Sequence, residues 1–403
     1  MGNARGSASP PSGRDLFDAA EKGYESDVAR LLRSGADPNW RNEDRETPLD
    51  IASENGHAAV VRLFLGAGAD VNQRTNGERT PLYVASENGH EAVVGLLLGA
   101  QANVNQGDYH GWTPLYIASE NGHEAVVGFL LGAQANANQG DYYGTTPLHI
   151  AAQNGHETVV QLLVSAGADV NKGMELERTP LYVASQNEHE AVVQLLFGAQ
   201  ANVNQGNYCG WTPLHIASEM GQKAVVQLLL SAGADVNQSD NCRNDPLNIA
   251  SEMGQKAVVQ LLLGAGADVN KSDIYGRTPL YIASENGQEA VVGLLLGAGA
   301  DVSQSNDKGQ TPLWIAAKEG HVLVVHSLVA KEANVNQADD RGQTPLSIAA
   351  KNGYLELVNF LIGNGANVHD AMTNDLITEE TARQHQTPPT TVTKHVQRSG
   401  ASW

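Results

Sequence analysis

The feature that most constrains the fold is a repeat of 33 residues, which runs through almost the whole chain. No interval between copies contains an insertion or a deletion. A period of this length is typical of a solenoid, in which each unit buries its apolar face against its neighbours. We therefore predict one elongated repeat domain for the 403 residues, in place of several globular domains. The tripeptide Thr-Pro-Leu begins at residues 47, 80, 113, 146, 179, 212, 278, 311 and 344, and Asp-Pro-Leu begins at residue 245.

Each unit predicts two short helices joined by a turn. In the copy that begins at Thr113, the threonine suits the N-cap position and Pro114 suits the first helical turn. Gly122 ends this helix, because the residue after a helix often needs a left-handed backbone. Apolar residues at helical spacing then predict a second helix up to Gly132, and a glycine-rich turn follows. Helices this short are marginal alone, so each must pack on the units before and after it.

The ends of the chain differ from the repeats. Residues 14–46 lack Thr-Pro and are more charged, as a terminal capping unit requires, and residues 47–369 hold ten full repeats. Residues 1–13 have nothing to bury, and we expect them to be disordered. Residues 370–403 are expected to be a tail, in which a short helix covers the last repeat and the remainder is disordered. The first residues nearly match an N-myristoylation signal, with a flexible tail as the simpler interpretation.

Composition and charge limit the classes of partner that the chain can bind. The net charge of −20 and the pI near 5.0 argue against nucleic acid, because affinity for it comes largely from Lys and Arg on phosphates. A basic protein or peptide is the better-matched partner. The chain has no long apolar run and no signal-peptide core, so we predict no transmembrane segment and a cytoplasmic or nuclear location. Cys209 and Cys242 lie one repeat apart, further than a disulfide spans between packed helices, so we expect free thiols.

No pattern in the sequence indicates catalysis. Gly66-Ala67-Gly68 follows an apolar run, but Val71 stands where a dinucleotide-binding loop needs its third glycine. The two isolated cysteines make no zinc site. We therefore predict a non-enzyme with no cofactor and no metal site. Eight histidines recur at fixed points of the repeat, which indicates a framework role: His57, His90, His123, His156, His189 and His321 after the first helix, and His149 and His215 directly after Thr-Pro-Leu.

The motif of the repeat resembles that of the ankyrin-repeat family, which has Thr-Pro-Leu-His-x-Ala at this period. The match is closest at residues 146–152 and 212–217, and the resemblance covers about residues 14–369. It implies an all-α solenoid, a curved and elongated stack of paired helices with β-hairpin fingers on one side. It also implies that partners bind on the face made by the fingers and the first helices. We therefore expect a monomeric protein-interaction scaffold or adaptor, with a substrate-recognition subunit for a ligase or modifying enzyme as the alternative.

The tips of the predicted fingers vary most between copies, which makes them candidates for partner recognition. Around two neighbouring tips the sequence concentrates aromatic residues, and a smaller group follows three repeats later. Tyr and Trp are enriched in binding hot spots, although stacking between fingers is an alternative role for these side chains. The candidates are Tyr109, His110, Trp112, Tyr142 and Tyr143, with Tyr208 and Trp211 as the later group.

A second candidate surface consists of glutamates that recur at the end of the first helix. Neighbouring units about 10 Å apart lie near one Debye length at physiological salt, so their charges partly reinforce one another. Such a track would steer a basic segment, and a solvated acidic face is the alternative interpretation. Lys318 and Lys351 replace the glutamate in the last two units. The candidates are Glu54, Glu87, Glu120, Glu219, Glu252 and Glu285.

Several copies depart from the pattern at glycine positions. Glu177 and Glu188 stand where most copies have glycine, at a cost of roughly 1 kcal/mol each if the backbone there needs positive φ. Conversely, glycine interrupts three second helices at residues 95, 128 and 293, where other copies have Gln. Each glycine should weaken its helix by about 1 kcal/mol, so we expect faster amide exchange in these helices.

Overall fold

The computed structural model describes residues 12–369, which divide between Asp235 and Val236 into two compact units. The predictions made for residues 1–11 and 370–403, including the short helix over the last repeat, lie outside the described residues. The first helix begins at Gly13, and the side chain of Ser12 accepts a hydrogen bond from the Arg14 N–H at 3.2 Å.

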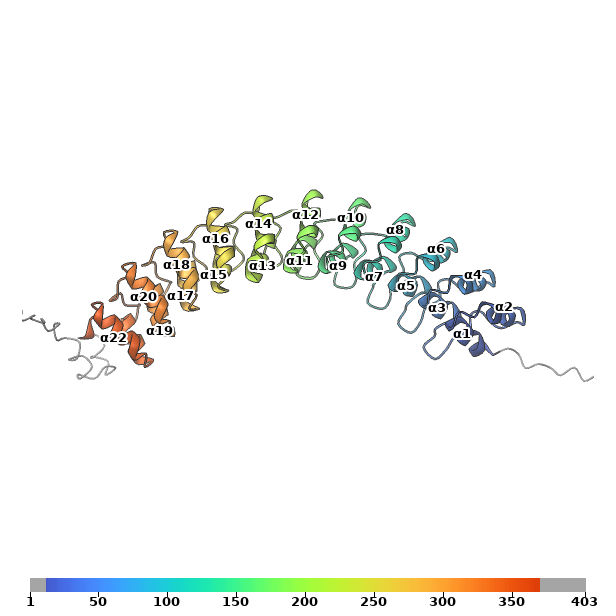
Figure 1. Ribbon diagram of the computed structural model, residues 1–403, viewed down its shortest axis with the longest axis horizontal. Helices are drawn as coiled ribbons and strands as arrows, with labels where there is room; N and C mark the ends of the chain where they lie inside the picture. Colours follow the sequence, from blue (N-terminus) through green and yellow to red (C-terminus); the bar gives the residue numbers. More distant parts are fainter. Residues whose placement is uncertain (1–11, 370–403) are drawn as a thin grey trace, which may run out of the picture. The chain divides into compact units, whose positions relative to one another are not determined.

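The first unit consists of consecutive helix pairs, in which odd-numbered first helices alternate with even-numbered second helices (Figure 1). Their bounds are α1 (Gly13–Glu21), α2 (Glu25–Arg33), α3 (Pro48–Glu54), α4 (Ala58–Gly66), α5 (Pro81–Glu87), α6 (Glu91–Gly99), α7 (Pro114–Glu120), α8 (Glu124–Gly132), α9 (Pro147–Asn154), α10 (Glu157–Ser165), α11 (Pro180–Gln186), α12 (Glu190–Gly198), α13 (Pro213–Met220) and α14 (Lys223–Ser231), with a 3₁₀ turn η1 (Glu175–Glu177) before α11.

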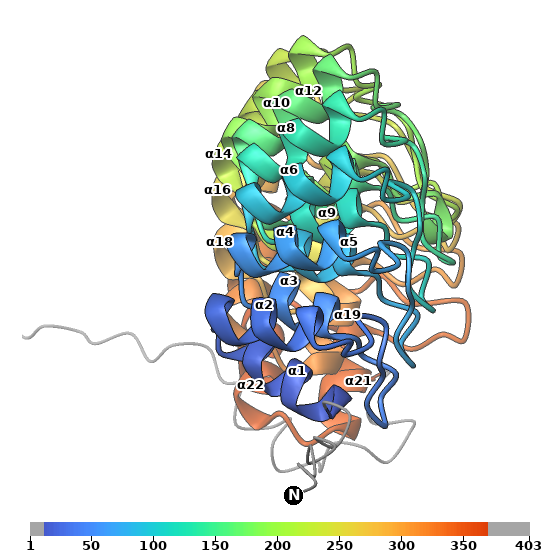
Figure 2. The same cartoon turned by 90° about the vertical axis from the view of Figure 1, so that its right-hand side faces the viewer.

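The second unit repeats the same arrangement of helix pairs. Its bounds are α15 (Pro246–Glu252), α16 (Lys256–Gly264), α17 (Pro279–Glu285), α18 (Glu289–Gly297), α19 (Pro312–Glu319), α20 (Val322–Ala330), α21 (Pro345–Lys351) and α22 (Leu355–Gly363). In both units the turns between pairs gather on the side of the first helices (Figure 2).

The predicted start and end of the first helices are confirmed. Thr113 caps α7, because its hydroxyl oxygen accepts the Tyr116 N–H at 3.1 Å, and Pro114 is the first helical residue. Gly122 follows the helix with φ +71°, in the left-handed region. From α3 onward, every first helix begins at the proline of the motif. The local sequence therefore sets these boundaries.

The core lies between first and second helices, and the two kinds of helix contribute differently. The first helix α7 is buried along nearly its whole length, from Pro114 to Ser119. The second helix α8 buries only one stripe, formed by Val126, Val127 and Leu130. Phe129 of the same apolar run is 47% exposed. Each second helix thus has a buried face and a face left to solvent.

The framework role of the histidines is confirmed by a contact between successive pairs. The ring Nε2 of His123 donates to the carbonyl oxygen of Glu87 at 2.9 Å, and the ring lies over Gly89. A Cβ on Gly89 would lie 2.7 Å from the ring Nδ1, and this glycine has φ +73°, so no larger side chain fits. The same hydrogen bond to a carbonyl 36 residues earlier is made by His57, His90, His156, His189 and His321.

The structure accounts for the departure at Glu188. This residue has φ +62°, as its glycine equivalents do, so the backbone there does need the left-handed region. The following pair has Gln222 in place of the histidine, and its amide Nε2 donates to the Gln186 carbonyl oxygen at 2.9 Å. A flexible amide thus lies opposite the Cβ of Glu188. Gln255 and Gln288 also replace the histidine, opposite Gly221 and Gly254, so the glutamine occurs without a Cβ to accommodate as well.

Asparagines in the loops after the second helices form a second regular link between pairs. The side-chain oxygen of Asn72 accepts the backbone N–H of Asn103 at 2.7 Å. The backbone N–H of Asn72 donates to the Asp70 carboxylate. Ser303 takes the asparagine position once and bonds Asp301 instead. The link to the residue 31 positions later is repeated by Asn39, Asn105, Asn138, Asn171 and Asn204 in the first unit, and by Asn237, Asn270 and Asn336 in the second.

The fingers differ in detail from the expected β-hairpins, because no strand occurs within residues 12–369. Each finger is a tight turn, and in most copies an Asp or Asn side chain accepts N–H groups of the turn. In the finger of residues 108–112, the Asp108 carboxylate accepts the N–H groups of His110 and Trp112 at 2.9 and 3.0 Å. A single backbone bond, from Tyr109 N–H to the Gly77 oxygen at 3.3 Å, joins this finger to the one before it. One bond per neighbour is too few for a strand ladder.

Candidate functional site

The aromatic finger of residues 109–112 forms a series of ring contacts. Tyr109 and His110 have ring centroids 3.7 Å apart, and His110 and Trp112 have centroids 4.7 Å apart. Trp112 then stacks on Tyr116 of α7, with centroids 5.5 Å apart and planes within 4°. The series leads from the tip of the finger to the first helix, so the sequence neighbours are also neighbours in space.

The structure divides the predicted aromatic group into exposed and packed members. Tyr109, Tyr142 and Tyr143 are 56%, 77% and 65% exposed. Trp112 is only partly exposed, because it packs against a buried cluster that includes Tyr83. The tyrosines therefore present most of their surface to solvent, whereas one side of Trp112 packs on the core.

Adjacent fingers are joined through the backbone and one polar contact. Tyr142 N–H donates to the His110 carbonyl oxygen at 3.3 Å, and the Trp112 indole donates to the Asp141 carboxylate at 3.2 Å. These bonds hold the tips of the two fingers next to each other. The exposure of Tyr142 and Tyr143 argues against the alternative in which their rings stack between fingers.

The later aromatic group does not join this patch. The finger with Leu176 lies between, since Glu175 N–H bonds the Tyr143 oxygen and Tyr208 N–H bonds the Leu176 oxygen, each at 2.8 Å. Tyr208 is 75% exposed, and the Trp211 ring stacks beside His215 with centroids 6.2 Å apart. Tyr208 and Trp211 thus form a separate group in the first unit.

Three of the predicted glutamates lie at the ends of successive first helices. Glu54, Glu87 and Glu120 are the last residues of α3, α5 and α7. Burial raises the pKa of Glu54 and Glu120, and the charge of Glu87 raises both further. Arg79 lies between the first two, 3.5 Å from the Glu87 carboxylate, and lowers the pKa of Glu54. Neighbouring carboxylates therefore act on one another, as the spacing predicted.

The other predicted glutamates do not extend this track. Gln153 and Gln186 occupy the next two helix ends, so Glu219 is separated from Glu120 by uncharged positions. In the second unit Glu252 is exposed, and Glu285 pairs with Arg277 at 3.2 Å. Lys318 and Lys351 follow at the predicted positions. The concentrated negative charge is thus in the first three full repeats.

The residue directly after Thr-Pro-Leu is buried in most copies, as expected for a hydrogen-bonding or packing role. The His149 ring Nδ1 accepts the Thr146 N–H, and its Nε2 donates to the Arg178 carbonyl oxygen at 3.1 Å. Burial lowers the pKa of His149 to about 4. Asp50 occupies the same position, and burial raises the pKa of this carboxyl to about 7 despite two hydrogen bonds from Thr47. Both groups are sealed in the framework, away from any substrate.

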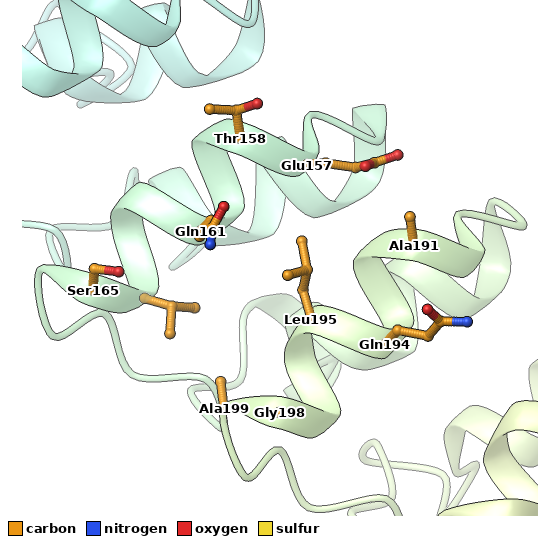
Figure 3. Close-up of a pocket in the computed structure, with 10 residues that line it drawn as sticks. Glu157, Thr158, Gln161, Ser165, Ala191, Gln194, Leu195, Gly198 and Ala199 are labelled. Atoms are coloured by element: carbon orange, nitrogen blue, oxygen red, sulfur yellow. The ribbon is translucent and has the colours of Figure 1, made fainter.

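A hollow that the sequence analysis did not predict lies between the second helices α10 and α12. It has a volume of about 560 Å³, and Glu157 is its one charged lining residue. Figure 3 shows Gln161 and Ser165 on one helix and Ala191 and Leu195 on the other, on either side of the gap. None of the predicted candidates lines it. Small residues at the ends of the second helices were the available signal.

The part of the chain that the structure describes contains neither a metal-ligand cluster nor a membrane-spanning helix. Between residues 12 and 369, no group of three or more His, Cys, Asp or Glu side chains is arranged to hold a metal ion. Within the same range, every helix is too short or too polar to cross a bilayer. Cys209 and Cys242 are both exposed free thiols, as predicted.

Comparison with known proteins agrees with this geometry. The family model for ankyrin repeats (3 copies) matches residues 16–108, 96–174, 170–240, 237–306 and 291–372. The chain therefore belongs to the ankyrin-repeat family, whose members generally mediate protein–protein interaction and are generally non-enzymatic. It is similar to the crystal structure of the human ASB11 ankyrin repeat domain, with 29% identity and a TM-score of 0.50 over 55% of this chain and 98% of that one. A search of curated protein sequences finds no match.

Proposed function

We propose that the protein is a non-catalytic scaffold or adaptor, which holds a partner protein on the fingers and first-helix ends of its first unit. The observation that carries the proposal is the patch of three tyrosines, Tyr109, Tyr142 and Tyr143, each more than half exposed. Large exposed aromatic side chains on one surface are the residue type that dominates binding energy at interfaces. The bonds between their fingers hold them in place before a partner arrives, which limits the entropy lost on binding.

The carboxylates favour a basic segment as the partner. Glu120 lies at the far end of α7 from the aromatic finger, roughly 10 Å along a helix of seven residues. One extended segment of a few residues spans that distance, so it can contact tyrosines and glutamates together. The net charge of −20 attracts a basic partner before contact.

The test is affinity capture from cell lysate with the full chain and two variants. The first variant replaces Tyr109, Tyr142 and Tyr143 by Ala, and leaves Trp112 in place because it packs on the core. The matched control is Phe129→Ala, which removes an aromatic ring that is 47% exposed on the second helix α8. We expect specific partners to be lost with the tyrosine variant and kept with the control. Equal capture by all three proteins, each folded by circular dichroism, would overturn the proposal.

The proposal includes an intracellular location and a monomeric chain. Two exposed thiols that stay unpaired are typical of a reducing compartment. Light scattering that gives a mass above 42.6 kDa in dilute buffer would contradict the monomer. The alternative, a subunit that presents substrates to a ligase or modifying enzyme, depends on a recruiting motif in residues 370–403 and stays a prediction.

A further inference from the structure

The first unit contains an arginine, Arg79, whose guanidinium contacts both an aromatic ring and a helix-end carboxylate. Arg79 lies over the Tyr83 ring, 5.2 Å from its centroid, and its Nη1 is 3.5 Å from the Glu87 carboxylate. Its charge also lowers the pKa of Glu54. The side chain therefore combines a cation–π contact with two carboxylates at the ends of neighbouring first helices.

In the second unit, the arginine at the equivalent position also pairs with its helix-end glutamate, but it lies against the ring of a finger-tip tyrosine. Arg277 places its Nε 2.8 Å from Asp273 and its Nη1 3.2 Å from Glu285. Its guanidinium lies 5.4 Å from the centroid of the Tyr275 ring. Both arginines directly precede the threonine of the motif, at residues 79 and 277. A guanidinium between the helix-end glutamate and an aromatic ring is thus a recurrent arrangement in this fold.

The repeat that begins at Thr113 lacks this cation. Trp112 stands at the arginine position and stacks on Tyr116, much as Arg79 lies over Tyr83. Glu120 at the end of the helix is only partly exposed, and no Lys or Arg between residues 12 and 369 forms an ion pair with it. Its pKa stays raised, by burial and by the neighbouring charge of Glu87. A half-buried carboxylate without a counter-ion is a costly arrangement that a bound cation relieves.

A second observation points to a missing polar partner at the same place. The Tyr83 side chain is fully buried in contact with Trp112, and its hydroxyl has no hydrogen-bond partner. Burial raises its pKa, and so do the charges of Asp108, Glu87 and Glu120. The hydroxyl therefore lies among these carboxylates. Buried hydroxyls without a partner are rare in native folds, because losing the hydrogen bond is expensive.

We infer that Glu120 binds an arginine side chain of the partner, whose guanidinium stacks on the Trp112 ring and supplies the positive charge that Arg79 and Arg277 bring to the helix-end glutamates of their own repeats. The inference rests on the proposed function and names the chemistry that its partner presents. Arginine fits better than lysine, because a planar guanidinium stacks on a ring and donates two parallel hydrogen bonds to one carboxylate. The exposed tyrosines on the two fingers then contact the residues that flank the arginine.

The first experiment titrates the full chain, labelled with 5-fluorotryptophan, with acetyl-arginine methylamide and follows the fluorine resonances. We expect the Trp112 resonance, assigned with Trp112→Phe, to shift, and that of the buried Trp314 to stay. Acetyl-citrulline methylamide has the same shape without the charge and should cause no shift. Glu120→Gln should weaken binding by roughly tenfold, whereas Glu124→Gln removes an exposed carboxylate four residues later and should leave it unchanged. Equal responses to both ligands, or unchanged binding in Glu120→Gln, would overturn the inference.

A second variant tests the inference in case Glu120→Gln does not fold. Trp112→Arg supplies the guanidinium from within the chain, as in the repeat of Arg79, and should lower the pKa of Glu120 measured by carbon NMR. An unchanged Glu120 pKa in this variant, folded by circular dichroism, would contradict the inference. The capture experiment separates the two proposals. If Glu120→Gln retains every partner that the tyrosine variant loses, the arginine site is wrong and the aromatic interface stands.

Discussion

First and second helices have similar lengths but are held in different ways. First helices from α3 onward begin at a proline after a capping residue, and they are buried on nearly all sides. Second helices such as α8 have no side-chain hydrogen bond at their N-cap and bury a single stripe. The first helices therefore pack closely on both neighbouring pairs, whereas the second helices leave one face to solvent.

Two glycines in one repeat show what this difference means for substitution. Gly122, after the first helix, has φ +71°, and a Cβ there would lie 2.8 Å from the His156 ring. Gly128, within the second helix, has open space around the position of a Cβ. The repeat pattern already separates them, because the position of Gly122 is glycine in every copy except Glu188, whereas the position of Gly128 has Gln in several copies.

The largest expected effect concerns the buried carboxyl of the first helix α3. A pKa of about 7 for Asp50, above its unfolded value of 3.8, means that the folded chain binds the extra proton. Its contribution to stability is therefore present below about pH 4 and is lost as the pH rises through 7. Relative to Asp50→Asn, the wild type should lose about 2 to 3 kcal/mol between pH 5 and pH 8. Urea unfolding at several pH values measures the difference, and parallel curves for the two proteins would contradict it.

The next largest effect is expected at Gly122, where the left-handed backbone requires glycine. Gly122→Ala places a methyl group against the His156 ring and forces alanine into the left-handed region, which should cost about 2 kcal/mol. Hydrogen exchange should speed up for the amides of α7 and α8 before it does so elsewhere. A loss below a few tenths of a kcal/mol would mean that the ring moves aside freely.

The coupling between Glu188 and Gln222 gives a smaller effect. Gln222→His alone restores a ring against a side chain that has no room for it, and should cost about 1 to 2 kcal/mol. The same change combined with Glu188→Gly restores the arrangement of Gly89 and His123, and should cost little. A double-mutant cycle from urea unfolding measures the coupling energy. Additive effects would show that the two departures are independent.

The smallest effect lies on the second helices and has the opposite sign. Gly128→Ala adds a methyl group to an exposed helical position with open space, and should stabilise the fold by up to about 1 kcal/mol. The same holds for Gly95 and Gly293, which have equally open surroundings. Slower amide exchange in α8 of the variant would agree with the faster exchange predicted for the glycine-bearing helices. An unchanged exchange rate would show that the glycine is not what weakens these helices.

Most of the fold could be predicted from the sequence, because its determinants are local or periodic. The cap at Thr113, the end near Gly122 and the framework role of His123 each follow from residue type and spacing. The prediction that the fingers are β-hairpins was wrong. The number of backbone bonds between neighbouring fingers depends on the distance between helix pairs, which the sequence does not show.

The candidate site was predictable only in part. The sequence located the aromatic cluster and the glutamates, but exposure depends on which side chains cover which, and so it did not separate Trp112 from Tyr109. Arg79 went unnoticed because its role appears only when its ring and carboxylate neighbours are known. The position it shares with Trp112 in the repeat was the available signal.

The asparagine link bears on how such a gene changes length. Because the bond from Asn72 to Asn103 is repeated with the same spacing at other loops, each loop presents the same donor and the same acceptor to its neighbour. Unequal recombination between misaligned copies therefore joins two halves that already fit, and adds or removes whole units of 33 residues. A copy with Ser303 in place of the asparagine is a less suitable junction, since its hydroxyl donates to Asp301 instead of accepting an N–H from the next loop.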